Sequence, residues 1–103
     1  MPTFEGRQLA AARALADLTI IELAEAAGVT KRTVQRLEIG GEQHIAKKLR
    51  HGHVSGDVWA MIVAALNRHG VELLPETDEH GAGVRWILPR AQRPQKWPRP
   101  VRN

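Results

Sequence analysis

With 103 residues, 43% of them hydrophobic and none of them cysteine, the chain can form one modest core but no disulfide, thiolate metal site or cysteine nucleophile. Fifteen lysines and arginines against eleven aspartates and glutamates give a formal net charge of +4, which favours a polyanionic partner. No apolar run approaches the ~20 residues that span a bilayer, and the N-terminus lacks the layout of a secretion signal, so we expect a cytoplasmic protein without membrane contact.

The first part of the chain predicts two helices. The stretch GRQLAAARALADLT, residues 6–19, is rich in Ala, Leu and Arg, and its apolar residues have the spacing of one buried stripe: Leu9, Ala12, Leu15 and Ala16. Thr19 can cap a second helix, because Glu22 stands three residues later in the arrangement of a capping box. We expect this second helix to end near Ala27.

A tight turn and a cationic third helix follow. Gly28 suits the left-handed backbone conformation that ends a helix, and Thr30 can cap the next one. In this third helix, residues 31–39, Val34 and Leu37 form the apolar pair that faces the core. The cationic and amide side chains then point outward: Lys31, Arg32, Gln35 and Arg36.

The stretch LTIIELAEAAGVTKRTVQRLEIG, residues 18–40, resembles the helix-turn-helix of Xre-type, lambda-repressor-like DNA-binding proteins. The resemblance extends over residues 7–40 and is carried by Leu23, Ala24, Gly28, Val29, Thr30, Val34, Leu37, Glu38 and Gly40. It implies a mainly α fold, a lambda-repressor-like helix-turn-helix bundle. It also implies a structural ion pair, partly buried, between an arginine of the first helix and the glutamate that closes the third, which are Arg13 and Glu38 here.

The resemblance implies that the third helix reads double-stranded DNA in the major groove. An α-helix fits this groove, and arginine and lysine favour the O6 and N7 atoms of guanine, so we expect G·C pairs among the contacted positions. The candidates for base reading are Lys31, Arg32 and Arg36, with Gln35 in the same interface. Thr30 and Thr33 would bind phosphate or touch a thymine methyl group. The alternative is that TKRTVQR is only the solvated face of an amphipathic helix.

The second helix departs from the family at its start. Ile20 stands where the family usually has a polar residue, commonly glutamine, that hydrogen-bonds the DNA backbone, and Ile21 also replaces a usually polar residue. Two adjacent isoleucines weaken one expected phosphate contact and predict a surface covered by a second copy or by a protein partner. The alternative is that one isoleucine packs into the protein's own core.

Residues 40–56, GGEQHIAKKLRHGHVSG, are longer than the connection usual at this place in the family. Ile45 and Leu49 have the spacing of a short helix between glycine-rich ends. The cations of this helix would contact phosphates that flank the groove, and they are Lys47, Lys48 and Arg50. The alternative is a solvated basic loop. No cysteine or carboxylate cluster accompanies the nearby histidines, so we expect no bound metal at His44, His51, His53 or His69.

The stretch VSGDVWAMIVAALNRHG, residues 54–70, predicts a longer helix. Ser55 or Asp57 lies near its start, and Gly70 can serve as its C-terminal cap. Trp59, Ile62 and Leu66 can face the core. The helix has further apolar residues, which make its stripe wider than one small bundle needs: Val58, Met61, Val63 and Ala65. We therefore expect a second buried face, supplied by dimerisation.

Residues 71–89 change to alternating apolar and polar positions around a glycine-containing turn, which predicts a short C-terminal β-hairpin. Its apolar positions are Val71, Leu73, Val84, Trp86 and Leu88. An isolated two-stranded ribbon is only marginally stable, so the hairpin must lie on the helices or pair with a copy from another chain. We expect a homodimer built mainly through residues 57–88.

Residues 90–103 are rich in proline and arginine and predict a basic, disordered tail. The chain thus divides into a helix-turn-helix domain (1–70), a hairpin (71–89) and this tail.

No catalytic constellation or phosphate-binding glycine loop occurs, so we expect neither an enzyme nor a cofactor. We expect a bacterial or phage-type transcriptional regulator that is cytoplasmic and nucleoid-associated when bound to DNA. The alternative is a protein-interaction module, an antitoxin-like or adaptor subunit whose helix-turn-helix is structural.

Overall fold

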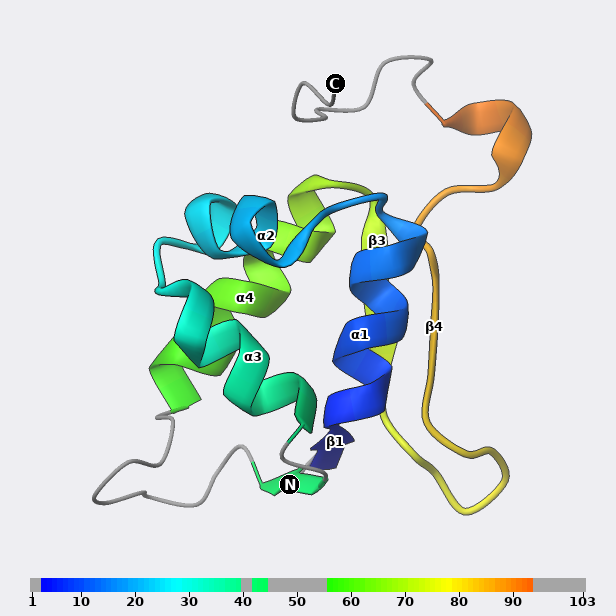
Figure 1. Cartoon of the computed structure of the whole chain (residues 1–103). Coiled ribbons are helices and arrows are strands. Elements are labelled where there is room, and N and C mark those ends of the chain that lie inside the picture. Colours follow the sequence, from blue (N-terminus) through cyan, green and yellow to red (C-terminus); the bar gives the residue numbers. More distant parts are fainter. Residues whose placement is uncertain (1–2, 40–41, 45–55, 94–103) are drawn as a thin grey trace.

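The computed structural model describes residues 3–39, 42–44 and 56–93 (Figure 1). This part of the chain is mainly helical, with two small antiparallel sheets, as the predicted fold class requires. In chain order its elements are β1 (Thr3–Glu5), α1 (Gly6–Leu15), α2 (Ile20–Ala27), α3 (Lys31–Ile39), β2 (Glu42–His44), α4 (Gly56–Arg68), β3 (Val71–Leu74), β4 (Gly83–Trp86) and the 3-10 helix η1 (Arg90–Gln92).

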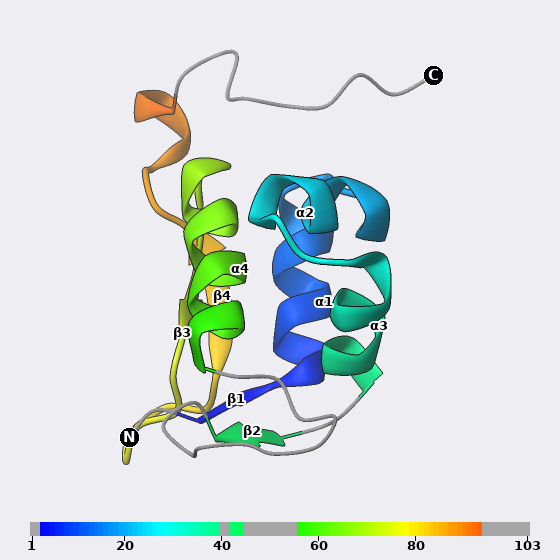
Figure 2. The same cartoon turned by 90° about the vertical axis from the view of Figure 1, so that its left-hand side faces the viewer.

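The four α-helices enclose one hydrophobic core. α3 contacts both α1 and α2, and α2 also contacts α4, so that the apolar faces of the helices meet (Figure 2). The large side chains that are fully buried are Leu9, Leu23, Val34, Leu37, Ile62, Leu66 and Val71. Burial of each such side chain stabilises the fold by roughly 1.5–3 kcal/mol, which makes this cluster the main source of stability.

α1 ends at Leu15, inside the stretch 6–19 that predicts the first helix. The amide of Ala16 still donates to the carbonyl of Ala12, but Asp17 adopts a positive φ of 61°, which stops the helical repeat. The change of direction turns Leu18 into the core, where it is buried. A helix continued to residue 19 would leave no chain for this turn.

The predicted C-terminal hairpin is present. β3 and β4 pair antiparallel, with Val71 opposite Trp86 and Leu73 opposite Val84. These four residues share the face of the ribbon that packs on the core, and β3 contacts α1 and α4 while β4 contacts α1. The hairpin is therefore stabilised by helices of its own chain. The second strand ends at Trp86, two residues before the predicted Leu88.

α4 uses most of its wide apolar stripe inside one chain. Trp59, Ile62 and Leu66 are buried as predicted. Of the residues expected to form a second, intermolecular face, Ala65 is fully buried, and Val58 and Val63 pack against the same core. The reason is that α2 and β3 both pack against α4. Met61 is the exception in this set, since its side chain is exposed.

The pairing of β1 with β2 was not predicted. Phe4 lies opposite Gln43, and the Phe4 ring stacks on the Trp59 ring with their centroids 5.7 Å apart. Residues 42–44, at the start of the segment in which a short helix is expected, form β2, because their backbone pairs with β1. The residues on which that prediction depended lie outside the described part of the chain: Ile45, Lys47, Lys48, Leu49 and Arg50.

The first residues of the predicted tail have regular structure. η1 follows Pro89, and the guanidinium group of Arg93 lies 4.5 Å from the centre of the Trp86 ring. Arg93 also donates a hydrogen bond from Nε to the carbonyl of Leu88, with a length of 2.8 Å. Disorder predicted from residue 90 is therefore not seen in residues 90–92, and residues 94–103 lie outside the described part.

Candidate nucleic-acid interface

The start of α2 has the capping box that its sequence predicts. The amide of Glu22 donates to Oγ1 of Thr19 over 3.1 Å, and the amide of Thr19 donates to Oε1 of Glu22 over 2.7 Å. The two side chains thereby satisfy backbone donors that a helix leaves without partners at its first turn. This cap sets where α2 begins and therefore where the turn after it falls.

The turn between α2 and α3 is made by a left-handed glycine. Gly28 has φ 74° and ψ 30°, the conformation in which a side chain would crowd the backbone. The amide of Val29 reaches back to the carbonyl of Ala24 over 3.0 Å, which closes the end of α2. The chain thus changes direction within three residues and starts α3 at Lys31.

Thr30 caps α3 rather than standing free. Its Oγ1 accepts a hydrogen bond from the amide of Thr33 over 3.2 Å and lies 2.9 Å from Oγ1 of Thr33. The hydroxyl group of each threonine is thus already engaged by the other. Any contact of these residues with phosphate must be made in addition to this cap, which also holds the N-terminal turn of α3 in place.

α3 has one apolar and one cationic face. Val34 and Leu37 are buried, whereas Lys31, Arg32 and Arg36 are exposed, and Gln35 is partly exposed on the same outward side. Within the described part of the chain, the side chains of Lys31 and Arg32 have no hydrogen-bond or ion-pair partner. Lys31 and Arg32 therefore present positive charge that the described part of the chain does not neutralise, on an element that fits the major groove of DNA.

An ion pair ties the end of α3 to α1. Arg13 donates from Nε to Oε2 of Glu38 over 2.7 Å and from Nη2 to Oε1 over 3.1 Å, a bidentate arrangement. A third bond runs from Nη1 to the carbonyl of Leu18 over 3.0 Å. The exposed fractions of the two side chains are 22% for Arg13 and 10% for Glu38. The pair therefore joins three segments of the domain and orients α3 on α1.

Two further contacts brace the helix-turn-helix, and neither was predicted. Gly6 lies so close to the carbonyls of Leu37 and Glu38 that a Cβ atom would overlap with them. Arg68, at the end of α4, donates from Nη2 to the carbonyl of Ala26 over 2.7 Å and so caps the last turn of α2. Gly6 gives no local signal, because its role depends on a helix that follows much later in the chain.

The two isoleucines at the start of α2 have different environments. Ile20 is partly buried against the core, whereas Ile21 remains 51% exposed. The alternative in which one isoleucine packs internally therefore describes Ile20. Ile21 is left as an apolar side chain on the surface of the helix-turn-helix.

The other predicted site residues do not gather into a second centre. Lys47, Lys48, Arg50, His51 and His53 lie outside the described residues. Across residues 3–39, 42–44 and 56–93, no group of three or more histidine or acidic side chains is placed to hold a metal ion. Within the same ranges, no helix is both long and apolar enough to cross a bilayer.

Comparison with known proteins agrees with this geometry. Residues 9–49 match the model of a family described as helix-turn-helix. None of the curated proteins compared with the chain matches it. The matched segment contains most of α1, all of α2 and α3, and the glycine turn between them. Over residues 9–49, the chain is thus similar to the Xre-type, lambda-repressor-like helix-turn-helix family, which confirms the resemblance found in its sequence.

Proposed function

We propose that the protein is a sequence-specific, double-stranded DNA-binding transcriptional regulator of the bacterial cytoplasm, and that it reads the major groove with α3. The observation that carries the proposal is the outward face of α3, where Lys31 and Arg32 have no partner within the described residues. The family match supports DNA binding by this segment. The proposed role of the protein is recognition, without a chemical step and without a cofactor.

Within the proposed interface, each group has a distinct role. Arg32 and Arg36 are one turn apart and would contact base edges, preferentially guanine, whereas Lys31 at the first turn would contact base or phosphate. Gln35 would contribute an amide contact beside them. Thr30 and Thr33 position the turn through their mutual hydrogen bond and would meet the DNA backbone at the helix N-terminus.

The test begins with selection of bound sites from randomised duplex DNA by the full chain, followed by affinity measurements with variants. We expect Arg32→Ala and Arg36→Ala each to weaken the selected site by about 1–3 kcal/mol and to relax the preference at particular base pairs. Arg7→Ala is the matched control, since it removes the same charge from an exposed position on α1. An unchanged base preference in both α3 variants would contradict the proposal.

Lys47, Lys48 and Arg50 are proposed to contact phosphates beside the groove. Replacing Lys47 and Lys48 by alanine should lower affinity for all sequences alike. The slope of log affinity against log salt should become shallower by about one unit for each phosphate that the variant no longer neutralises. An unaltered salt dependence would contradict the phosphate contacts and favour the alternative of a solvated basic loop.

A second candidate is the protein-interaction module, favoured by the exposed Ile21 at the start of α2. In that case α3 would be structural, and Ile21 would lie against a protein partner. The selection experiment separates the two candidates, because an interaction module would enrich no sequence. Ile21→Ser would then reduce binding to the partner.

A further inference from the structure

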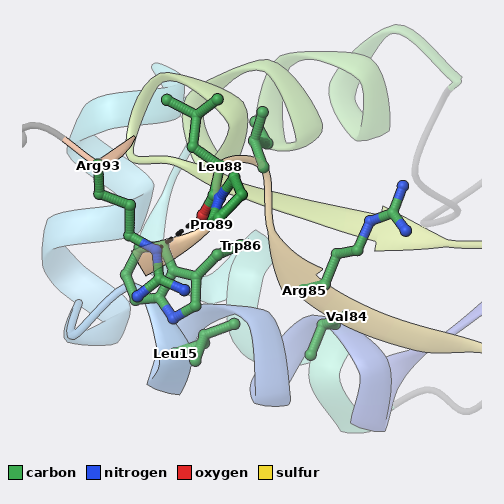
Figure 3. A pocket seen from close by; sticks show the side chains of 8 residues that line it. Leu15, Val84, Arg85, Trp86, Leu88, Pro89 and Arg93 are labelled. Carbon is green, nitrogen blue, oxygen red and sulfur yellow. Dashed lines mark hydrogen bonds between the residues drawn. The ribbon is translucent and has the colours of Figure 1, made fainter. Parts of the chain in front are cut away.

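The open edge of the hairpin has an apolar hollow beside it (Figure 3). Its lining includes Leu15 at the end of α1, Trp86 on β4, and Leu88 and Pro89 after the strand. Arg93 closes one side by stacking over Trp86. Ile87, in the same lining, remains 41% exposed, and such a large apolar side chain at the edge of a hollow is typical of an interaction surface.

This hollow lies on the opposite side of the domain from the candidate DNA-reading helix. In Figure 1, α3 lies on one side of α1, whereas β4 and η1 lie on the other. Figure 2 shows the same separation after a quarter turn. Another molecule seated on the hollow would therefore leave α3 accessible.

One end of the hairpin is acidic. The loop between β3 and β4 exposes the carboxylates of Glu76, Asp78 and Glu79, and none of these three side chains has a hydrogen-bond or ion-pair partner within the described residues. The loop has a defined conformation, because Oγ1 of Thr77 accepts hydrogen bonds from the amides of Glu79 (3.2 Å) and His80 (3.0 Å). The backbone that carries the three acidic side chains therefore has a defined position at this end of the hairpin.

The base of this loop is also attached to the helices. Nε2 of Gln8, on α1, donates to the carbonyl of Leu74 over 2.7 Å and to that of Gly83 over 2.9 Å. The opposite end of the hairpin is basic, with an exposed Arg90 in η1 and Arg93 on Trp86. The ion pair of Glu72 and Arg85 between the two ends leaves the middle without net charge.

We propose that a second copy of this chain docks on the hollow in an antiparallel orientation, related by a two-fold axis. In this arrangement the acidic loop of each copy meets the basic η1 segment of the other, and Ile87 enters the shared apolar contact. A parallel arrangement would instead place acid against acid and base against base, which is unfavourable. The surface is thus self-complementary, as a two-fold interface must be.

The choice of a second copy, rather than an unrelated partner, rests on this self-complementarity and on the proposed function. A single recognition helix reads only a few base pairs, and helix-turn-helix dimers read half-sites about 34 Å apart. The hollow offers a pairing surface that keeps both copies of α3 exposed. As the proposed site of dimerisation, the hollow takes the place of the α4 face, because most apolar residues of α4 pack inside their own chain.

The first test measures association of the full chain by sedimentation without DNA, so that its outcome does not depend on whether the protein binds DNA. We expect a dimer at micromolar concentration, weaker at high salt because the charged ends are exposed. Ile87→Asp should raise the dimer dissociation constant at least ~10-fold. Ile39→Asp is the matched control, because Ile39 is strongly exposed on α3, far from the hollow, and should have no effect.

The second test exchanges charges. The loop variant carries Glu76→Lys, Asp78→Lys and Glu79→Lys, and the η1 variant carries Arg90→Glu and Gln92→Glu, which leaves Arg93 on Trp86. Each variant alone should dissociate at least ~10-fold more readily than the wild type, because like charges then face each other. An equimolar mixture of the two variants should recover the wild-type dissociation constant. In the mixed dimer, the basic loop of one copy meets the acidic η1 segment of the other, and the unchanged acidic loop meets the unchanged basic η1 segment.

Three results would overturn this interface: a wild-type monomer at all concentrations, charge variants that dimerise like the wild type, or folded single variants whose mixture stays monomeric. Circular dichroism of each variant establishes that it is folded. A wild-type monomer that still selects a DNA sequence would refute the dimer and leave the proposed function standing. A wild-type dimer that enriches no DNA sequence would refute the proposed function and leave the dimer interface standing.

Discussion

Replacing Glu38 by glutamine should destabilise the domain far more than the same replacement in the hairpin. In the wild type, the Glu38 carboxylate accepts two hydrogen bonds from Arg13 and is 10% exposed. Glutamine keeps the size of the side chain but removes its charge and one acceptor, so that the guanidinium group of Arg13 loses its counter-ion in a largely desolvated place. The substitution therefore tests the electrostatic contribution with little change in packing.

The expected magnitude follows from the burial of the pair. Breaking a fully buried pair costs about 3–5 kcal/mol, but Arg13 is 22% exposed and keeps its bond to Leu18, so we expect a loss of about 2–3 kcal/mol. For a domain of this size, that corresponds to a fall in Tm of roughly 10–20 °C. The control is Glu72→Gln, whose partner Arg85 is 62% exposed, and its expected cost is below about 1 kcal/mol.

The measurement is urea unfolding of both variants and of the wild type, followed by circular dichroism. A double-mutant cycle with Arg13→Met isolates the interaction free energy, which should exceed about 1 kcal/mol because the two groups are in direct contact. Equal losses for Glu38→Gln and Glu72→Gln would refute the reasoning, since they would show that burial of the Arg13–Glu38 pair has no energetic consequence.

Two other predictions concern contacts that locate α1. Gly6→Ala should cost about 1–3 kcal/mol in urea unfolding, because its Cβ would overlap with the backbone at the end of α3. Gly81→Ala, where nothing lies within 4 Å of the added Cβ, should change stability little, and a similar loss in both variants would contradict the overlap. Gln8→Leu should cost about 2 kcal/mol, because it removes two hydrogen bonds to the hairpin, and should speed hydrogen exchange in β3 and β4. Unchanged exchange there would show that Gln8 does not hold the hairpin.

Local signals in the sequence determined the helix-turn-helix. The capping box at Thr19, the left-handed Gly28, the cap at Thr30 and the buried pair Val34 and Leu37 all depend on partners within a few residues or on a helical repeat. Such interactions form wherever the residues stand at the required spacing, so they are readable without a fold. The outward position of the α3 cations follows from the same repeat.

Tertiary structure decided the features whose partners are distant in sequence. The sequence did not predict the pairing of β1 with β2, because a three-residue strand has no local pattern that indicates which distant segment it pairs with. The wide apolar stripe of α4 predicted an intermolecular face, but α2 and the hairpin pack against much of it. Likewise, Ile20 and Ile21 are equivalent in sequence, and the direction of α2 on the core alone separates a packed from an exposed side chain. Burial depends on how whole elements meet, and hydrophobic periodicity states which face is apolar without stating what covers it.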